Sequence, residues 1–120
     1  LGSASIEKAQ GSMQVRGRDM VTGLPRVVEV PAKEIAVAMS EIIHQILDAV
    51  KDVLEQTPPE ISADVIDHGI VLTGGGAMLR HLAEMISKET QVPAFVANDP
   101  LDCVALGTGA ILANPSLMKK

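Results

Sequence analysis

The 120-residue sequence contains no tryptophan, no tyrosine and a single phenylalanine, Phe95. A core without aromatic rings must be built from aliphatic side chains and the six methionines, which suits helices packed on a sheet. The one cysteine, Cys103, cannot form an internal disulfide, and this fits a reducing compartment. These absences predict a helix-rich α/β protein in the cytoplasm.

Clusters of basic residues are also missing. The formal net charge is −5, and the longest run of Lys or Arg is the pair Lys119–Lys120. Binding to a phosphate backbone needs clustered cations, so we expect no nucleic-acid partner. No apolar stretch reaches the roughly 20 residues of a membrane span, and no basic-then-apolar leader opens the sequence. A chain of this length forms one domain at most.

Residues 12–30 carry the pattern of a β-hairpin. Met13 and Val15 alternate with polar residues, and three valines follow the sequence Gly23-Leu24-Pro25. Valine-rich segments on both sides of a Gly/Pro turn favour two antiparallel strands. Gly17, inside the first strand, predicts a bulge or a close backbone approach.

A long amphipathic helix is predicted from about Ala32 to Gln56. Pro31 suits its first turn, and Thr57-Pro58-Pro59 ends it. Apolar residues recur at three- and four-residue spacing, which predicts one apolar stripe along the helix. The stripe consists of Ile35, Met39, Ile42, Ile43, Ile46, Leu47, Val50, Val53 and Leu54.

The second half of the sequence alternates between strands and helices. Ile70-Val71-Leu72 is typical of a strand buried on both faces, and Gly69 before it should be the left-handed cap of a short helix. The alternation predicts a parallel βαβ unit, which should belong to a larger sheet because buried strands need neighbours. The expected segments are helices over 60–67, 79–89 and 104–113, and strands over 70–72 and 92–97.

The chemical motif of the sequence is Leu72-Thr73-Gly74-Gly75-Gly76-Ala77, at the end of the predicted strand. Three glycines remove every Cβ from the turn, so the backbone can take positive φ and approach a ligand closely. A helix beginning after Ala77 would add unpaired N–H groups and its positive dipole end. Ligands of open α/β sheets bind at such strand ends. A phosphate, or the flat face of a base or ribose, would suit this turn.

Two familiar nucleotide sites do not fit this motif. The fingerprint G-x-G-x-x-G is not matched, because Ala77 and Leu79 stand where glycines should be. The phosphate-binding loop is not matched either, because no Gly-Lys-Ser/Thr follows. A tight turn that binds nothing remains an alternative.

Several segments resemble one known family. Residues 70–79, Ile70 to Leu79, look like the adenosine motif of the actin, sugar-kinase and heat-shock ATPase superfamily. Residues 15–25 are similar to the hairpin of the MreB family of bacterial actins, and so is the segment from Thr57 to Gly69. Residues 99–109 resemble its second connecting helix, and residues 1–4 another family segment. The sequence departs from the family mainly at 5–10 and 31–32.

The resemblance implies a fragment of the second domain of an actin-like (ribonuclease H-like) ATPase. Residues 1–31 would be the hairpin segment of the outer subdomain. Residues 32–120 would be the helices and parallel strands of the inner subdomain, with the adenosine motif. The adenosine side of a Mg-ATP pocket would be lined by Gly74, Gly75, Gly76 and Ala77, with Met78 beside the adenine. Gly107 and Gly109 would let the last helix cross near the interdomain hinge, or serve plain helix packing.

The function implied is that of a filament-forming cytoskeletal protein that organises cell-wall synthesis and determines rod shape. Its partners would be further copies of itself, cell-wall elongation proteins, a membrane adaptor and the inner membrane surface, reached through regions missing here. The phosphate turns and the acidic residues for Mg²⁺ have no counterpart in this sequence, which begins at Leu1 and fits a fragment. We therefore predict no catalytic residue or metal ligand here, and neither ATP hydrolysis nor tight ATP binding by this chain alone.

Two other functions stay open at this point. The glycine turn also occurs in kinases and other ATPases of the superfamily, although the hairpin and Thr57-Pro58-Pro59-Glu60 favour the MreB family. A stand-alone interaction module is the second alternative, and it would have to cover its strand edges by docking. The three histidines share no metal-ligand spacing, and Cys103 has no evident histidine partner. Arg16-Gly17-Arg18-Asp19 should be the solvated side of the hairpin, with a filament contact as the alternative.

Overall fold

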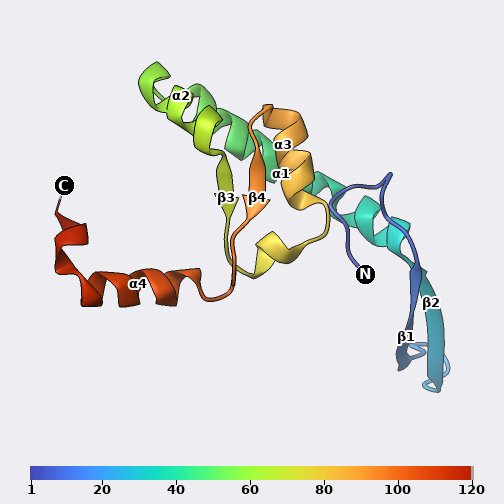
Figure 1. The fold of residues 1–120 in the computed structure, drawn as a ribbon. Coiled ribbons are helices and arrows are strands. Elements are labelled where there is room, and N and C mark those ends of the chain that lie inside the picture. Colours follow the sequence, from blue (N-terminus) through green and yellow to red (C-terminus); the bar gives the residue numbers. More distant parts are fainter. Residues whose placement is uncertain (120) are drawn as a thin grey trace.

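The computed structural model describes residues 1–119 and confirms the predicted α/β class (Figure 1). A β-hairpin is followed by a long helix and then by alternating helices and parallel strands. The chain is elongated, with principal extents of 63 × 34 × 21 Å. The elements are β1 (Ser12–Arg18), β2 (Pro25–Pro31), α1 (Ala32–Glu55), α2 (Pro59–His68), β3 (Ile70–Leu72), η1 (Gly75–Met78), α3 (Leu82–Thr90), β4 (Ala94–Val96), α4 (Cys103–Ala113) and η2 (Pro115–Met118).

The predicted hairpin is present and projects from one end of the molecule (Figure 1). β1 and β2 pair antiparallel without interruption from Ser12↔Pro31 to Arg18↔Pro25. The prediction of a bulge or close approach at Gly17 is wrong, because Gly17 pairs regularly with Arg26 and a Cβ there would meet no atom within 4 Å.

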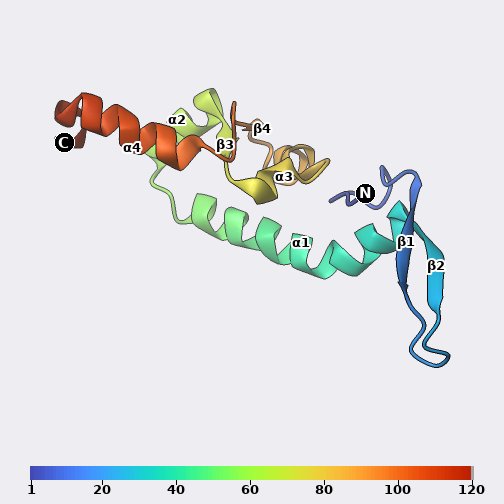
Figure 2. The ribbon, with the colours of Figure 1, turned by 90° about the horizontal axis from the view of Figure 1, so that it is seen from below.

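Helix α1 matches its predicted range and lies along one side of the molecule (Figure 2). Its buried residues are Ala32, Ala36, Ile43 and Leu47. The predicted apolar stripe is wider than the face that packs, since Ile42 and Val53 are exposed.

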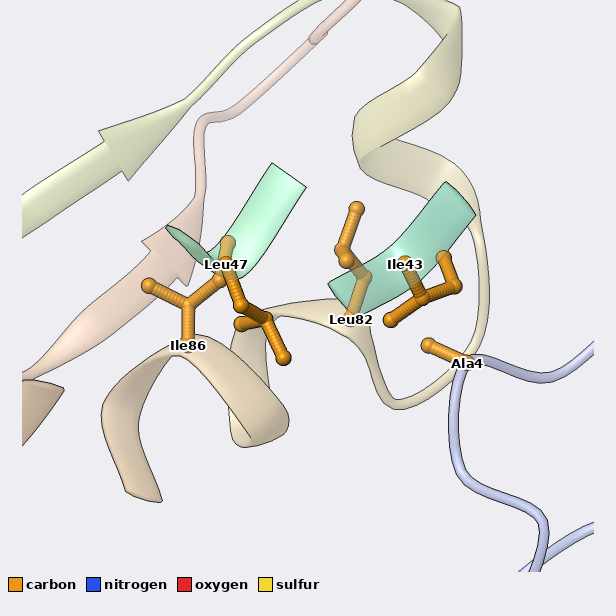
Figure 3. Close-up of a cluster of buried hydrophobic side chains, with 5 residues drawn as sticks. All are labelled: Ala4, Ile43, Leu47, Leu82 and Ile86. Carbon is orange, nitrogen blue, oxygen red and sulfur yellow. The ribbon is translucent and has the colours of Figure 1, made fainter. Parts of the chain in front are cut away.

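The core joins three segments that are distant in the sequence (Figure 3). Ala4 comes from the N-terminal segment, Ile43 and Leu47 from α1, and Leu82 and Ile86 from α3. As predicted from the composition, its side chains are aliphatic, whereas Phe95 lies outside it and is half-exposed.

Strands β3 and β4 pair in parallel, with the register Ile70↔Ala94, Val71↔Phe95 and Leu72↔Val96. Ile70, Leu72 and Ala94 pack against the core, whereas Val71 and Phe95, which alternate with them, remain 52% and 48% exposed. The strand was expected to be buried on both faces, but this chain covers one face only. The other face is left with exposed apolar side chains.

Helix α4 extends away from the other helices (Figure 1) and buries no residue. Val104 and Leu112 are 77% and 83% exposed although the helix is strongly apolar. Within residues 1–119, no helix is both long and apolar enough to cross a membrane.

Candidate functional site

The glycine motif forms a turn where β3 ends, beside the segment that leaves β4. The two strands are parallel, so both segments emerge from the same edge of the sheet. The backbone N–H of Ala97 donates to the carbonyl of Leu72 at 2.9 Å, and that of Gly74 donates to the carbonyl of Pro100 at 2.7 Å. The start of the turn is therefore fixed to the segment 97–102, at the strand ends where open α/β sheets bind ligands.

Each residue of the turn has a distinct conformation. Gly74 takes φ 82° and ψ 173°, a conformation that L side chains rarely adopt. A Cβ at Gly75 would contact Leu101 Cδ2 at 3.4 Å, whereas one at Gly76 would meet no atom within 4 Å. Ala77 is buried, and its N–H donates to the carbonyl of Gly74 at 3.2 Å. The turn thus anchors itself through Ala77 and leaves the backbone of Gly75 and Gly76 exposed, with open space around a Cβ at Gly76 only.

The helix after the turn begins later than predicted. Residues 75–78 form the short 3-10 turn η1, Leu79 is extended, and α3 starts only at Leu82. The N–H groups of the first turn of α3 are therefore not at the glycines, because the helix starts four residues after Met78. The segment 97–102 also carries the exposed carboxylates Asp99 and Asp102, which would repel an anion. The arrangement suits an uncharged face, such as a base or a ribose, better than a phosphate.

The end of the turn is held by residues that the sequence pattern did not single out for function. Arg80 and His81 contact the N-terminal segment 1–4 through backbone and side-chain hydrogen bonds. These residues are almost 80 positions apart in the chain, so no local pattern could have revealed the pairing. The resemblance of residues 1–4 to a family segment was the one available signal.

A pocket in the described part of the chain lies away from the glycine turn. A pocket of about 370 Å³ opens between residues 4–8, α1 and α3, and none of its residues belongs to the glycine turn. Lys8 and Glu84 form an ion pair on this pocket, and the hydrogen bond from Lys8 lowers the pKa of Glu84 below its ordinary value. Lys51 likewise lowers the pKa of Glu89, which also lies on the pocket.

The other candidate residues have structural contacts. His44 and His68 each place Nδ1 near the backbone carbonyl four residues earlier, at 2.7 and 3.0 Å. The Sγ of Cys103 lies 3.5 Å from the carbonyl of Asp99. Across residues 1–119, no three His, Cys, Asp or Glu side chains gather as metal ligands would. A Cβ built at Gly107 or Gly109 would meet no atom within 4 Å. Within this chain, therefore, no close contact explains either the expected crossing near the hinge or helix packing at these glycines.

Comparison with known proteins gives consistent matches over the whole chain. The family model described as "MreB/Mbl protein" matches residues 1–120. The chain is 50% identical over 108 residues to the "Cell shape-determining protein Mbl" of Bacillus subtilis, covering 90% of this chain and 32% of that protein. It is 44% identical over 112 residues to the "Cell shape-determining protein MreB" of Escherichia coli, covering 93% of this chain and 32% of that protein.

Solved structures agree with the sequence matches. The crystal structure of MreB5 of Spiroplasma citri bound to ADP superposes with a TM-score of 0.85 at 35% identity, covering 95% of this chain and 35% of that one. The structure of the same protein bound to AMPPNP gives a TM-score of 0.84, covering 96% of this chain and 34% of that one. The chain thus spans about a third of the length of the relatives that it matches.

Proposed function

Because the chain belongs to the MreB/Mbl family, we propose that it is the carboxy-terminal part of a nucleotide-binding, filament-forming bacterial actin. Relatives at 44–50% identity are named as cell shape-determining proteins. The complete protein would assemble into filaments and determine rod shape by organising cell-wall synthesis. The similarity to these relatives supports this function over that of a kinase of the same superfamily or a stand-alone module.

The glycine turn is the part of this chain that we assign to the nucleotide. The MreB5 structures hold ADP and AMPPNP, which have an adenosine in common. The observation that carries the assignment is the open backbone of Gly75 and Gly76 at the strand ends, with nothing within 4 Å of a Cβ at Gly76. Gly74 and Ala77 would hold the turn in place, and Met78, which is 59% exposed, would lie beside the base.

The rest of the nucleotide site would lie outside this chain. We assign the phosphates, Mg²⁺ and slow ATP hydrolysis to the complete protein, and we expect the isolated chain to bind ATP weakly and not to hydrolyse it. Residues 1–31 would belong to the outer subdomain and residues 32–120 to the inner one. Cell-wall elongation proteins, a membrane adaptor and the inner membrane surface would be partners of the complete, cytoplasmic protein.

Substitution of Gly76 by valine in the complete protein tests the nucleotide assignment. A Cβ at this position would meet no atom of this chain within 4 Å, so we expect the fold to be unaffected, but the valine would occupy the space assigned to adenosine. We expect the dissociation constant for ADP, measured by calorimetry, to rise at least about tenfold, which corresponds to roughly 1.4 kcal/mol. The thermal unfolding temperature without nucleotide should stay unchanged.

Gly17→Val is the matched control, because Gly17 also has open space around its Cβ position but lies in the hairpin. It should leave ADP affinity as in the wild type. Unaltered ADP affinity in the Gly76 variant would instead support the alternative that the glycines form a turn without a ligand.

A further inference from the structure

The turn assigned to adenosine ends on two residues that are bound to the N-terminal segment. The backbone N–H of Ala4 donates to the carbonyl of Arg80 at 2.8 Å, and Ser3 and Arg80 form an isolated parallel bridge. The Arg80 guanidinium donates to the carbonyl of Leu1 at 3.0 Å and to that of Gly2 at 3.3 Å. These bonds fix the path of the chain just after η1.

A side-chain contact completes this attachment. Ser3 is fully buried, and its Oγ lies 2.8 Å from Nδ1 of His81. The same hydroxyl donates to the carbonyl of Ser5 at 2.9 Å, so its single proton is used there and Oγ accepts from Nδ1–H of His81. The hydroxyl also accepts from the backbone N–H of Ser5 at 3.3 Å, so its donor and both acceptor positions are used. Loss of the Ser3 hydroxyl would leave Nδ1–H of His81 without this partner.

His81 also has an unusual backbone. It takes φ 67° and ψ 4°, in the left-handed region, and precedes the first residue of α3. Non-glycine residues in this region are uncommon and are held there by their surroundings. Glycine would suit the backbone better, but it could not make the bond to Ser3. The histidine is therefore kept in a costly conformation in which its ring reaches the buried hydroxyl.

We propose that the Ser3–His81 hydrogen bond positions the glycine turn for nucleotide, with Ser3 and His81 acting as positioning residues that do not touch the ligand. This inference rests on the proposed function. The start of the turn is fixed by the bond from Gly74 to Pro100, and its end by this contact and the Arg80 bonds. With both ends fixed, the backbone of Gly75 and Gly76 is held in one conformation before nucleotide binds. Binding then carries no entropic cost for ordering the turn.

The test uses three single variants of the complete protein and the double variant Ser3→Ala/His81→Gly. Ser3→Ala removes the acceptor, together with the two hydrogen bonds between the hydroxyl and the backbone of Ser5. His81→Gly removes only the donor and suits the left-handed backbone. His81→Asn keeps a side-chain N–H at nearly the same place and tolerates that backbone. We expect Ser3→Ala and His81→Gly to weaken binding of both ADP and AMPPNP about three- to tenfold, the range for one hydrogen bond. The factor should be the same for both nucleotides, because the turn faces the adenosine that they share. His81→Asn should restore affinity to within about twofold, and the double variant should be no worse than the single ones.

Ser87→Ala is the matched control. Its partly buried hydroxyl ties α3 to β4 by accepting from the N–H of Ala94 at 2.7 Å, so its loss should lower stability but not nucleotide affinity. If the wild type binds ADP but Ser3→Ala binds it equally well, or if Ser87→Ala loses as much affinity as Ser3→Ala, the positioning role is wrong. If the wild type does not bind ADP at all, the proposed function itself fails, and this inference with it.

Discussion

The backbone N–H of Gly74 lies 2.7 Å from the carbonyl oxygen of Pro100, and this bond joins the two segments that leave the parallel strands. Gly74 can make it because its φ of 82° turns the chain sharply at the end of β3. The bond places the glycine turn against the segment 97–102, so a ligand at the strand ends would contact both. Two strands of three residues each thereby hold the assigned part of a nucleotide site.

The start of β3 depends on another glycine, Gly69, and its substitution by alanine should be strongly destabilising. Gly69 has φ 83° and ψ −178°, and a Cβ would lie 2.7 Å from the backbone oxygen of Pro93, next to β4. Strain at such a conformation costs about 1 to 3 kcal/mol, and the clash with backbone adds to it. We expect the free energy of unfolding of the complete protein, measured in urea, to fall by at least about 2 kcal/mol.

Two other glycines separate the causes of this loss. Gly11 has φ 91° but no atom within 4 Å of a Cβ, so the stability lost in Gly11→Ala measures backbone strain without a clash. Gly17 has neither a positive φ nor an atom within 4 Å of a Cβ, so Gly17→Ala introduces neither strain nor a clash. Gly69→Ala should be the most destabilising of the three and Gly17→Ala nearly neutral. Equal losses for Gly69→Ala and Gly11→Ala would mean that Pro93 moves away freely.

Periodicity in the sequence was enough to predict most elements. Helix α1 ends within one residue of its predicted end, because the apolar spacing and the prolines around it are local signals. Gly69 was predicted to take the left-handed conformation, and the structure has positive φ with an extended ψ instead. Local patterns therefore identified the turn residue but not its full conformation.

Contacts between distant segments could not be predicted in this way. The delayed start of α3 follows from the path of Leu79 to His81, which is fixed by bonds to residues 1–4. The wrong prediction at Gly17 has a different cause: a glycine in a strand carries no signal that distinguishes a bulge from regular pairing. The glycine turn was located by its sequence, whereas the residues that hold it came only from the structure.

The core should respond in a graded manner to smaller side chains at Ile86. This residue is 2% exposed and packs with Leu47 and Leu82 (Figure 3). No aromatic ring in the cluster could move in to fill a cavity. We expect Ile86→Val to lower the free energy of unfolding by about 0.5 to 1.5 kcal/mol and Ile86→Ala by about 2 to 5 kcal/mol. Urea denaturation of the complete protein measures both, and a loss below about 1 kcal/mol for Ile86→Ala would show that the site collapses freely.

The carboxylate of Asp19 should organise the turn of the hairpin in a manner that depends on pH. Its Oδ1 accepts from the backbone N–H of Thr22 at 3.0 Å and of Val21 at 2.8 Å, and Oδ2 pairs with Arg26 at 3.2 Å. The backbone bond from Thr22, then that from Val21, and also Arg26 hold the pKa of Asp19 below its ordinary value of 3.8. A lowered pKa means that the carboxylate stabilises the folded turn above pH 3.8, and that this contribution is lost as the pH falls through the lower folded value.

A titration by nuclear magnetic resonance measures this directly in the complete protein. The side-chain carboxyl signal of Asp19 should titrate with a midpoint below 3.8, and the amide signals of Val21 and Thr22 should move with the same midpoint. In Asp19→Asn the amide oxygen can still accept both N–H groups, but it does not titrate, so these amide signals should stay constant over that range. A midpoint at or above 3.8 would mean that the hairpin turn is not closed by this carboxylate in solution.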